Sequence, residues 1–386
     1  MDRLIRRFHQ IKTALIYTCI KSGSFLCRRR PWVLLERGTD ARDNAYFFYR
    51  FLKKNHPEKK IYYIIDKDSP DYHKVKEDAV HFGSLKNYWV IATAEKIIST
   101  HCYKGLPHIN PKLFRFFRLN EKHFFLQHGI TQCDLPQLYS EQTGVQLFVC
   151  GAKPEFDYIS DKFGYPSGAV RYTGFARYDT LHDAQTKKQI LIMPTWRMYI
   201  TDENRFLESA YYRQWNQLLT DPRLAEYLEK KELSMIFYPH YEVQKYLHLF
   251  RTGSDRIILA DFANYDVQTL LKESKLLVTD YSSVFFDFAY MRKPVVYFQF
   301  DQEDFFGRHY NRGYFSYPEM GFGPVTASVE AAVDAMTECA EHDFMPTEAY
   351  RKRMEDFFPL YDQKNCERIF DAICSLQIPQ QKEEKR

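Results

Sequence analysis

Short apolar runs and amphipathic stretches alternate along almost the whole of this chain. Runs such as Ile61–Asp66 and Leu276–Thr279 end at a polar residue, which is typical of buried strands. Stretches with apolar residues at helical spacing, such as 44–54 and 205–219, follow these runs. This alternation predicts β–α units and parallel sheets, an α/β fold.

The alternation occurs in two consecutive series, which predict two domains. We expect a Rossmann-like domain over 31–182 and a second over 183–358. A C-terminal segment with a helix and a tail, 359–386, follows, and the last helix is expected over 347–376. Domains of this kind bind ligands at the carboxyl ends of their strands, so the residues that follow strands are the candidates for chemistry.

Residues 1–30 have the pattern of a basic amphipathic helix. Its apolar residues at helical spacing are Leu4, Ile5, Phe8, Ile11, Leu15 and Cys19. Eight Lys and Arg against the single acid Asp2 give the segment a net charge of +7. Such a helix can bind an anionic membrane surface, and the alternative is an ordinary surface helix packed on the domain. We expect peripheral association with the cytoplasmic face of the cell membrane.

Composition argues against several other classes of protein. The net charge of +4 is small for 386 residues, and no motif that binds nucleic acid is present. The eight cysteines form no close pair, which predicts reduced thiols in a cytosolic protein and no metal site. No apolar run approaches the ~18–20 residues that a membrane-spanning helix needs, and the N-terminus lacks the features of a signal peptide.

The segment from Leu276 to Phe298 is the most informative. A buried strand ends at Thr279 and Asp280, and Ser282 and Ser283 then open a helix. Serines at a helix start cap its free N–H groups, and the same position suits a phosphate. Taken alone, the two interpretations have about equal weight, and the position directly after a strand favours phosphate.

Other polar residues also follow predicted strands. His128 and Gly129 come after one strand, and a histidine there suits general base catalysis. His240 follows a strand of the second series, and Arg197 follows another and could clamp phosphate oxygens. Each has a structural alternative, a core histidine or a surface ion pair. Together they predict a phosphate-binding site.

The chain resembles a known family in several motifs. They are LQHG (126–129), YTGFARYD (172–179), MPTWR (193–197), FYPH (237–240), VTDYSSVFFDFAYMRKPVVYF (278–298), RGY (312–314) and GFGP (321–324). These segments resemble the CDP-glycerol glycerophosphotransferases, which make teichoic acids. The resemblance implies a GT-B fold, in which two Rossmann-like domains face each other across a cleft. It also implies a CDP-glycerol donor and release of CMP. We expect no metal or other cofactor, because fixed donors can neutralise the leaving group.

Residue by residue, the resemblance assigns a role to each matching position. His128 would be the catalytic base and His240 a second essential histidine on the donor phosphates. The other donor-phosphate residues would be Thr195, Arg197, Asp280, Ser282 and Ser283, and Gln127 and Gly129 would lie on the acceptor side. The first motif is LQHGIT here, whereas many wall teichoic acid members have Trp-His-Gly-Thr, so the acceptor stays open.

The expected function is transfer of glycerol phosphate from CDP-glycerol to a hydroxyl of a lipid-linked or glycan acceptor, in teichoic acid or capsule synthesis. CDP-ribitol is an equally compatible donor. A GT-B glycosyltransferase or sugar-nucleotide epimerase is the second hypothesis, because it could use a similar serine-containing loop. A membrane-docked binding protein without turnover is the third. No nucleic-acid partner is expected.

Overall fold

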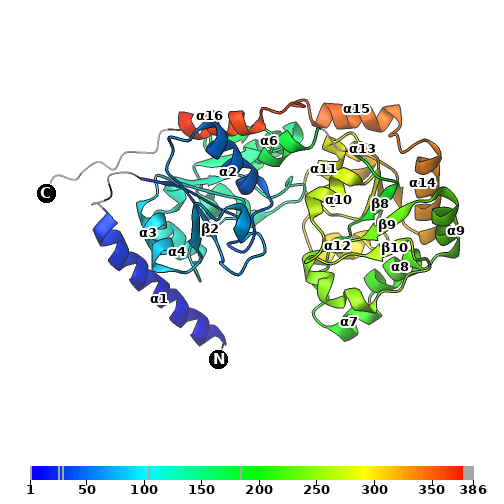
Figure 1. Cartoon of the computed structure of the whole chain (residues 1–386), viewed down its shortest axis with the longest axis horizontal. Helices are drawn as coiled ribbons and strands as arrows, with labels where there is room; N and C mark the ends of the chain where they lie inside the picture. The colour runs from blue at the N-terminus through cyan, green and yellow to red at the C-terminus, as the bar shows by residue number, and fades with distance from the viewer. Residues whose placement is uncertain (1, 25–26, 28–29, 103–104, 183–184, 377–386) are drawn as a thin grey trace. The chain divides into compact units, whose positions relative to one another are not determined.

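A computed structural model describes residues 2–24, 27, 30–102, 105–182 and 185–376. The chain divides into two compact units. Unit 1 comprises Met1–Ile130, Pro136–Thr180 and Asp362–Arg386, and unit 2 comprises Thr131–Leu135 and Leu181–Tyr361. Each unit is a parallel sheet with helices on both faces (Figure 1). The predicted pair of Rossmann-like α/β domains is confirmed.

The sheet of unit 1 has seven strands in the order β3-β2-β1-β4-β5-β6-β7, and all neighbouring strands are parallel. Its central strands are apolar on both faces, as a parallel sheet covered by helices requires; all four residues of β1 are buried. The strands are β1 (Trp32–Leu35), β2 (Ile61–Ile65), β3 (Ala79–His81), β4 (Lys96–Ser99), β5 (His123–Phe125), β6 (Leu147–Cys150) and β7 (Val170–Tyr172).

The helices of unit 1 cover both faces of this sheet. The crossovers β1–α2–β2 and β3–α3–β4 run in opposite directions across the sheet, so right-handed connections place α2 and α3 on opposite faces. α16 packs against α2, and α1 packs against α3 (Figure 1). The helices are α1 (Asp2–Gly23), α2 (Asn44–Asn55), α3 (Leu85–Thr93), α4 (Pro111–Phe116), α5 (Ser140–Thr143), α6 (Lys153–Lys162) and α16 (Asn365–Ser375), with 3-10 turns η2 (Tyr72–Lys74), η3 (Asn120–Lys122), η4 (Pro136–Leu138) and η5 (Ala176–Thr180).

Helix α1 is attached to unit 1 by Thr13, Tyr17 and the partly buried Ile16 and Ile20, and not by its expected apolar stripe. Thr13 is buried and donates to the carbonyl of Pro107 over 2.9 Å, and the buried ring of Tyr17 lies 4.4 Å from that of Phe117. The apolar residues of the expected stripe are exposed: Leu4 (73%), Ile5 (49%), Phe8 (66%), Ile11 (60%) and Leu15 (63%). Residues 1, 25, 26, 28 and 29 of the predicted segment 1–30 lie outside the described residues. Within the described part of the chain, no helix has the length and apolar character to cross a bilayer.

The sheet of unit 2 has six parallel strands in the order β10-β9-β8-β11-β12-β13. Its strands are β8 (Gln189–Ile192), β9 (Ser234–Phe237), β10 (Ile257–Leu259), β11 (Leu276–Thr279), β12 (Val295–Phe298) and β13 (Val325–Thr326). Its helices are α7 (Glu203–Glu208), α8 (Ala210–Leu219), α9 (Pro222–Lys231), α10 (Val267–Glu273), α11 (Val284–Tyr290), α12 (Gln302–Arg308), α13 (Tyr317–Met320), α14 (Val329–Glu341) and α15 (Glu348–Phe357), with the 3-10 segment η6 (Tyr241–Leu249).

Two predicted helices are each divided in the structure. The helix expected over 205–219 is two helices, because the Ser209 side chain accepts from the Tyr212 N–H and starts α8. The helix expected over 347–376 ends at Phe357, because Pro359 disfavours a helical conformation at the residue before it. The chain then starts α16 at Asn365 and returns to unit 1. The last residues of the predicted segment 359–386, 377–386, lie outside the described residues.

The motif YTGFARYD holds α16 on unit 1. Gly174 has a φ of +75°, and a Cβ there would lie 1.8 Å from the Asn365 side-chain oxygen, so only glycine fits. The carboxylate of Asp179 accepts from the backbone N–H of Asn365 (2.8 Å), its side-chain amide (2.7 Å) and the N–H of Cys366 (2.9 Å). Asp179 therefore serves as the cap of α16, although it lies far away in the sequence.

We expect Asp179→Ala to destabilise unit 1 by about 1–3 kcal/mol, because three donors at the start of α16 lose their acceptor. The urea midpoint should fall, and limited proteolysis should cut the chain near α16 sooner. Asp371→Ala, which removes an exposed carboxylate from the same helix, is the matched control. Equal stability of the two variants would contradict the capping role.

Candidate functional site

His128 lies at the carboxyl edge of the unit 1 sheet, just after β5. Its side chain is exposed, and its ring stacks on that of His101, with centroids 4.8 Å apart and planes 12° apart. A ring N–H of His128 donates to the backbone of Thr100, which follows the neighbouring strand β4. This bond assigns the proton to one nitrogen of the neutral ring and leaves a lone pair on the other.

The surroundings of His128 favour the neutral imidazole. Its pKa is lowered to about 4, first by desolvation and then by the positive charges of Arg37 and Arg177, while the bond to Thr100 acts in the opposite direction. The side chain is open to solvent, so water limits its desolvation, and the two nearby guanidinium groups disfavour the protonated ring. At neutral pH the ring is therefore unprotonated and able to accept a proton.

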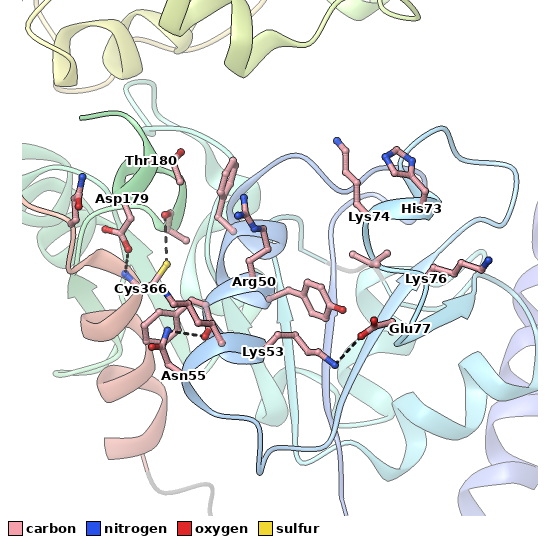
Figure 2. Close-up of a pocket in the computed structure, with 17 residues that line it drawn as sticks. Arg50, Lys53, Asn55, His73, Lys74, Lys76, Glu77, Asp179, Thr180 and Cys366 are labelled. Atoms are coloured by element: carbon pink, nitrogen blue, oxygen red, sulfur yellow. Dashed lines mark hydrogen bonds and ion pairs between the residues drawn. The ribbon is translucent and has the colours of Figure 1, made fainter. Parts of the chain in front are cut away.

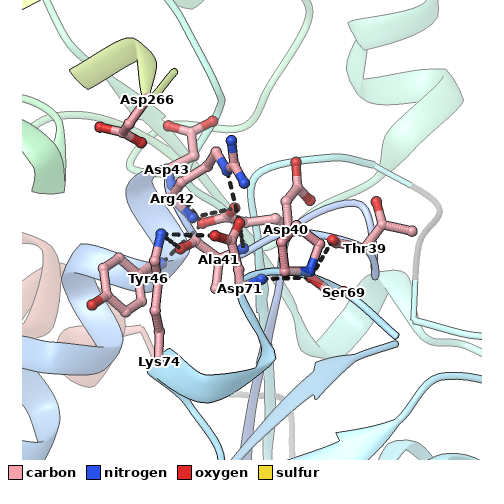
Figure 3. A network of polar contacts seen from close by, with 12 residues as sticks. Thr39, Asp40, Ala41, Arg42, Asp43, Tyr46, Ser69, Asp71, Lys74 and Asp266 are labelled. Atoms are coloured by element: carbon pink, nitrogen blue, oxygen red, sulfur yellow. Dashed lines mark hydrogen bonds and ion pairs between the residues drawn. The ribbon is translucent and has the colours of Figure 1, made fainter. Parts of the chain in front are cut away.

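A network of acidic side chains orders the start of α2 beside this edge (Figure 3). Asp43 is the N-cap of α2 and pairs with the buried Arg177 over 3.0 Å. Asp71 accepts from the Arg42 guanidinium over 2.7 Å. Glu36, at the end of β1, accepts the backbone N–H groups of Arg42 (3.0 Å) and Asp43 (2.8 Å), and burial raises its pKa well above the usual value. The network fixes the position of Arg177, one of the two cations that act on His128.

The two residues expected on the acceptor side have different environments. Gln127 is buried with a φ of +57°, and its amide donates to the Val149 carbonyl (2.7 Å) and to Glu155 (3.0 Å). The side chain of Gln127 therefore points into unit 1 and is hydrogen-bonded within the protein, and its expected place on the acceptor side stays a prediction. Gly129 is buried directly after His128.

In unit 2, the sheet order brings together the segments that follow β8, β9, β11 and β12. Asp280, fully buried after β11, accepts the backbone N–H groups of Thr195 (2.8 Å) and Tyr281 (2.6 Å). It thereby joins the loop after β8 to the loop after β11. Neighbouring parallel strands with opposite connections at this point form the usual position of a ligand site in α/β sheets.

Arg197 lies beneath these loops and not at their surface. Its side chain is fully buried between Asp280 (2.9 Å) and Asp301 (2.7 Å). Burial acts to lower the pKa of Arg197, but the two carboxylates outweigh it and keep the guanidinium charged. Two carboxylates share one cation, and burial raises the pKa of Asp280. This environment does not fit the expected direct phosphate contact of Arg197 and Asp280, because their charges are paired inside the protein.

The serines and their neighbours keep hydroxyl groups available at the same edge. Ser282 and Ser283 are half-buried, and the Ser283 side chain makes no capping bond to α11. The Thr195 hydroxyl is buried without a hydrogen-bond partner among the described residues. The His240 ring stacks on Trp196 at 5.9 Å, and its Nδ1 accepts from the Glu242 N–H over 3.3 Å.

Several site residues were not singled out from the sequence. Asp301 had a detectable signal, because it follows the apolar strand β12 in the run VVYFQFD. Arg177 was part of the motif YTGFARYD but had no role assigned to it, and no role was assigned to His101 either. Arg37 had no signal, because its effect on His128 depends on folding.

The comparisons with known proteins identify the family. The model of the CDP-glycerol:poly(glycerophosphate) glycerophosphotransferase family matches residues 24–375. The chain belongs to this family.

Two sequence relatives of this family member are proteins of teichoic acid synthesis. It is 33% identical over 389 residues to the minor teichoic acid biosynthesis protein GgaB of Bacillus subtilis, an alignment that spans 96% of the chain and 43% of GgaB. It is 24% identical to the teichoic acid poly(glycerol phosphate) polymerase of the same organism, over 96% of the chain and 52% of the polymerase. The chain thus spans about half the length of these two relatives.

Solved structures share the fold of this family member. The wall teichoic acid polymerase TagF matches 97% of the chain and 98% of its own chain, with a TM-score of 0.68 and 16% identity. The UDP complex of S. aureus MnaA matches 89% of the chain and 96% of its own, with a TM-score of 0.58 and 14% identity.

Among the described residues of the chain, no three His, Cys, Asp or Glu side chains gather into a possible metal site.

We expect the imidazole signals of His128 in an NMR titration to shift at a pH clearly below about 6.5, the ordinary midpoint of a histidine, because Arg37 and Arg177 oppose protonation. Arg37→Gln removes a positive charge that opposes protonation, so the pKa of His128 should rise. The rise should be a fraction of a pH unit, because Arg37 is half exposed and screened. Lys112→Gln, an exposed change elsewhere in unit 1, should leave the pKa unchanged. A wild-type midpoint near pH 6.5 would refute this account.

Proposed function

We propose that this chain transfers glycerol phosphate from CDP-glycerol to a hydroxyl of a lipid-linked or glycan acceptor, in the synthesis of a teichoic acid or a capsule-type polymer. One observation carries the proposal within the family: His128 lies at the carboxyl edge of unit 1, where one ring nitrogen donates to the Thr100 backbone and the other stays able to accept a proton. Membership of the family and a TagF structure obtained after a soak with CDPG support the choice of donor.

In the proposed reaction, the acceptor hydroxyl transfers its proton to the lone pair of the His128 ring. Its oxygen forms a bond to the phosphorus next to glycerol, and the bond from that phosphorus to the bridging oxygen of CMP breaks. CMP leaves with the electron pair of that bond. A general base of this kind contributes about 10²–10⁴-fold to a rate.

The phosphate oxygens are assigned to hydroxyl donors of unit 2. The Ser283 hydroxyl makes no capping bond to α11, and the neighbouring Ser282 is half-buried beside it. The Thr195 hydroxyl is buried without a hydrogen-bond partner in the described part of the chain, which supports a ligand oxygen there. His240 is proposed to add a further donor. Arg197 and Asp280 act indirectly, by holding the loops that carry these hydroxyls.

CDP-ribitol is the second candidate donor. The relatives include a teichoic acid poly(ribitol-phosphate) polymerase of Bacillus spizizenii, 27% identical over 64% of the chain. The chemistry at phosphorus is the same for both donors, so the base and the phosphate-binding hydroxyls keep their roles. A glycosyltransferase or epimerase activity has only the shared fold in its favour.

We also propose that α1 attaches the protein to the cytoplasmic face of the cell membrane. The helix is fixed to unit 1 through Thr13 and Tyr17, and its apolar stripe, defined above, faces solvent. Arg6, Arg7 and Lys12 are exposed on the same helix, where they can attract anionic lipid. Apolar area and positive charge together are the requirements for interfacial binding.

We expect the wild-type protein to release CMP from CDP-glycerol in the presence of a lipid-linked acceptor, with a product heavier by one glycerol phosphate unit. His128→Ala should lower the rate by about 10²–10⁴-fold with little change in donor affinity, because the base acts on the acceptor. Parallel reactions with CDP-ribitol in place of CDP-glycerol show which donor the protein uses. His248→Ala, at an exposed histidine, is the matched control for His128→Ala. Full activity of His128→Ala, or UDP release from a UDP-sugar in place of CMP release, would overturn the proposal.

Sedimentation with phosphatidylglycerol vesicles tests the role of α1. The double change Phe8→Ser and Leu15→Ser should weaken vesicle binding by about tenfold or more, because two apolar side chains no longer enter the bilayer. Both side chains are exposed, so stability should not change. Met345→Ser, at an exposed apolar residue of unit 2, should bind as the wild type does. Undiminished binding of the double variant would rule out this attachment.

A further inference from the structure

A basic groove runs over the outer surface of α2 in unit 1 (Figure 2). Its volume is about 850 Å³, within the range of ligand sites. Its walls are α2, the segment from His73 to Glu77, η5 and the start of α16. The groove lies apart from the residues assigned above to catalysis, and the proposed reaction leaves it without a role.

Three cations of the groove have no acidic partner among the described residues. They are Arg50, Lys54 and Lys76, all of them exposed. Lys53 is different, because it pairs with Asp78 at 2.8 Å and with Glu77 at 3.5 Å. The unpaired cations therefore give the groove an excess of positive charge.

The spacing of these positive charges destabilises helix α2. Arg50 and Lys54 are four residues apart, so they lie on one face of α2, about 6 Å apart along its axis, and repel each other. The lining carboxylate of Asp179 does not offset them, because it is fully used as the cap of α16. An anionic ligand with several charges would relieve this repulsion.

The course of the groove connects it with the site around His128. His73 follows β2 and Thr180 follows β7, so one end of the groove lies at the carboxyl edge of the sheet, where His128 also lies. The other end lies at Lys53 and Lys54, where α2 ends before β2 begins. A long ligand with its reacting end at the carboxyl edge could continue along α2.

We infer that this groove binds the phosphodiester chain of a polyol-phosphate acceptor. The inference rests on the proposed function, which makes such a chain the acceptor or the product. Exposed, flexible side chains without a buried polar anchor suit a repeating polyanion better than one small molecule. A lipid surface fits less well, because α2 and the membrane-directed α1 belong to opposite faces of the same sheet.

The test compares two triple variants of the full chain with equal loss of charge. The groove variant is Arg50→Gln, Lys54→Gln and Lys76→Gln. The control variant is Lys60→Gln, Lys86→Gln and Lys112→Gln, at three exposed lysines outside the groove. The probe is a fluorescent synthetic oligomer of glycerol phosphate, and binding is measured by anisotropy at several salt concentrations.

We expect the groove variant to bind the oligomer about tenfold or more weakly at low salt, with a smaller salt dependence, because fewer counterions are released. The control variant should bind as the wild type does. Equal affinity of the groove variant and the wild type, or equal losses in both variants, would overturn the inference. So would a groove variant that loses affinity for phosphatidylglycerol vesicles while it keeps its affinity for the oligomer.

CMP release separates this inference from the proposed function. With an acceptor that carries a single polyol phosphate, the groove variant should keep the wild-type rate; with a long acceptor, its KM should rise. An equal loss with both acceptors would contradict a chain-binding role. If the wild type releases no CMP from either CDP-polyol, the proposed function is wrong. Binding of the oligomer needs no donor, so it would still decide the role of the groove.

Discussion

The parallel direction of the strands is the constraint on which both candidate sites depend. Because all strands of a unit point the same way, the segments that leave them emerge at one edge of the sheet. In unit 2 this brings Thr195 next to Asp280, although 85 residues separate them. In unit 1 it brings His128 beside the end of β4 and within the field of Arg177.

Buried charges then make these edges rigid. Removing a guanidinium and two carboxylates from water is costly, so Arg197, Asp280 and Asp301 keep together and tie three loops of unit 2 into one arrangement. In unit 1, Asp179 accepts hydrogen bonds at the start of α16, and Arg177 pairs with Asp43 at the start of α2. These contacts hold the two helix ends in place. Several motif residues of the family therefore position the chain, while the half-buried Ser282 and Ser283 and the exposed imidazole of His128 lie at the edges.

The two faces of the unit 1 sheet have different surfaces. One face carries α3 and, packed on it, α1 with its exposed apolar residues. The other carries α2, with cations that no acid neutralises among the described residues. In the account proposed here, one face is directed to the lipid and the other to the polymer, so the two anionic partners do not compete for one surface.

The sequence by itself determined the two series of β–α units and the residues that follow the strands, because the spacing of apolar positions is a local property that burial imposes on each element. It also located the helix starting near Ser283, while short elements such as β3, whose three residues carry little pattern, were not predicted.

Only the tertiary structure decided what the polar residues do. It showed that Arg197 and Gln127 are buried and used within the protein, that His128 has a lowered pKa, and that the apolar stripe of α1 faces solvent. Burial and charge pairing depend on residues far apart in the chain, so no local pattern contains them.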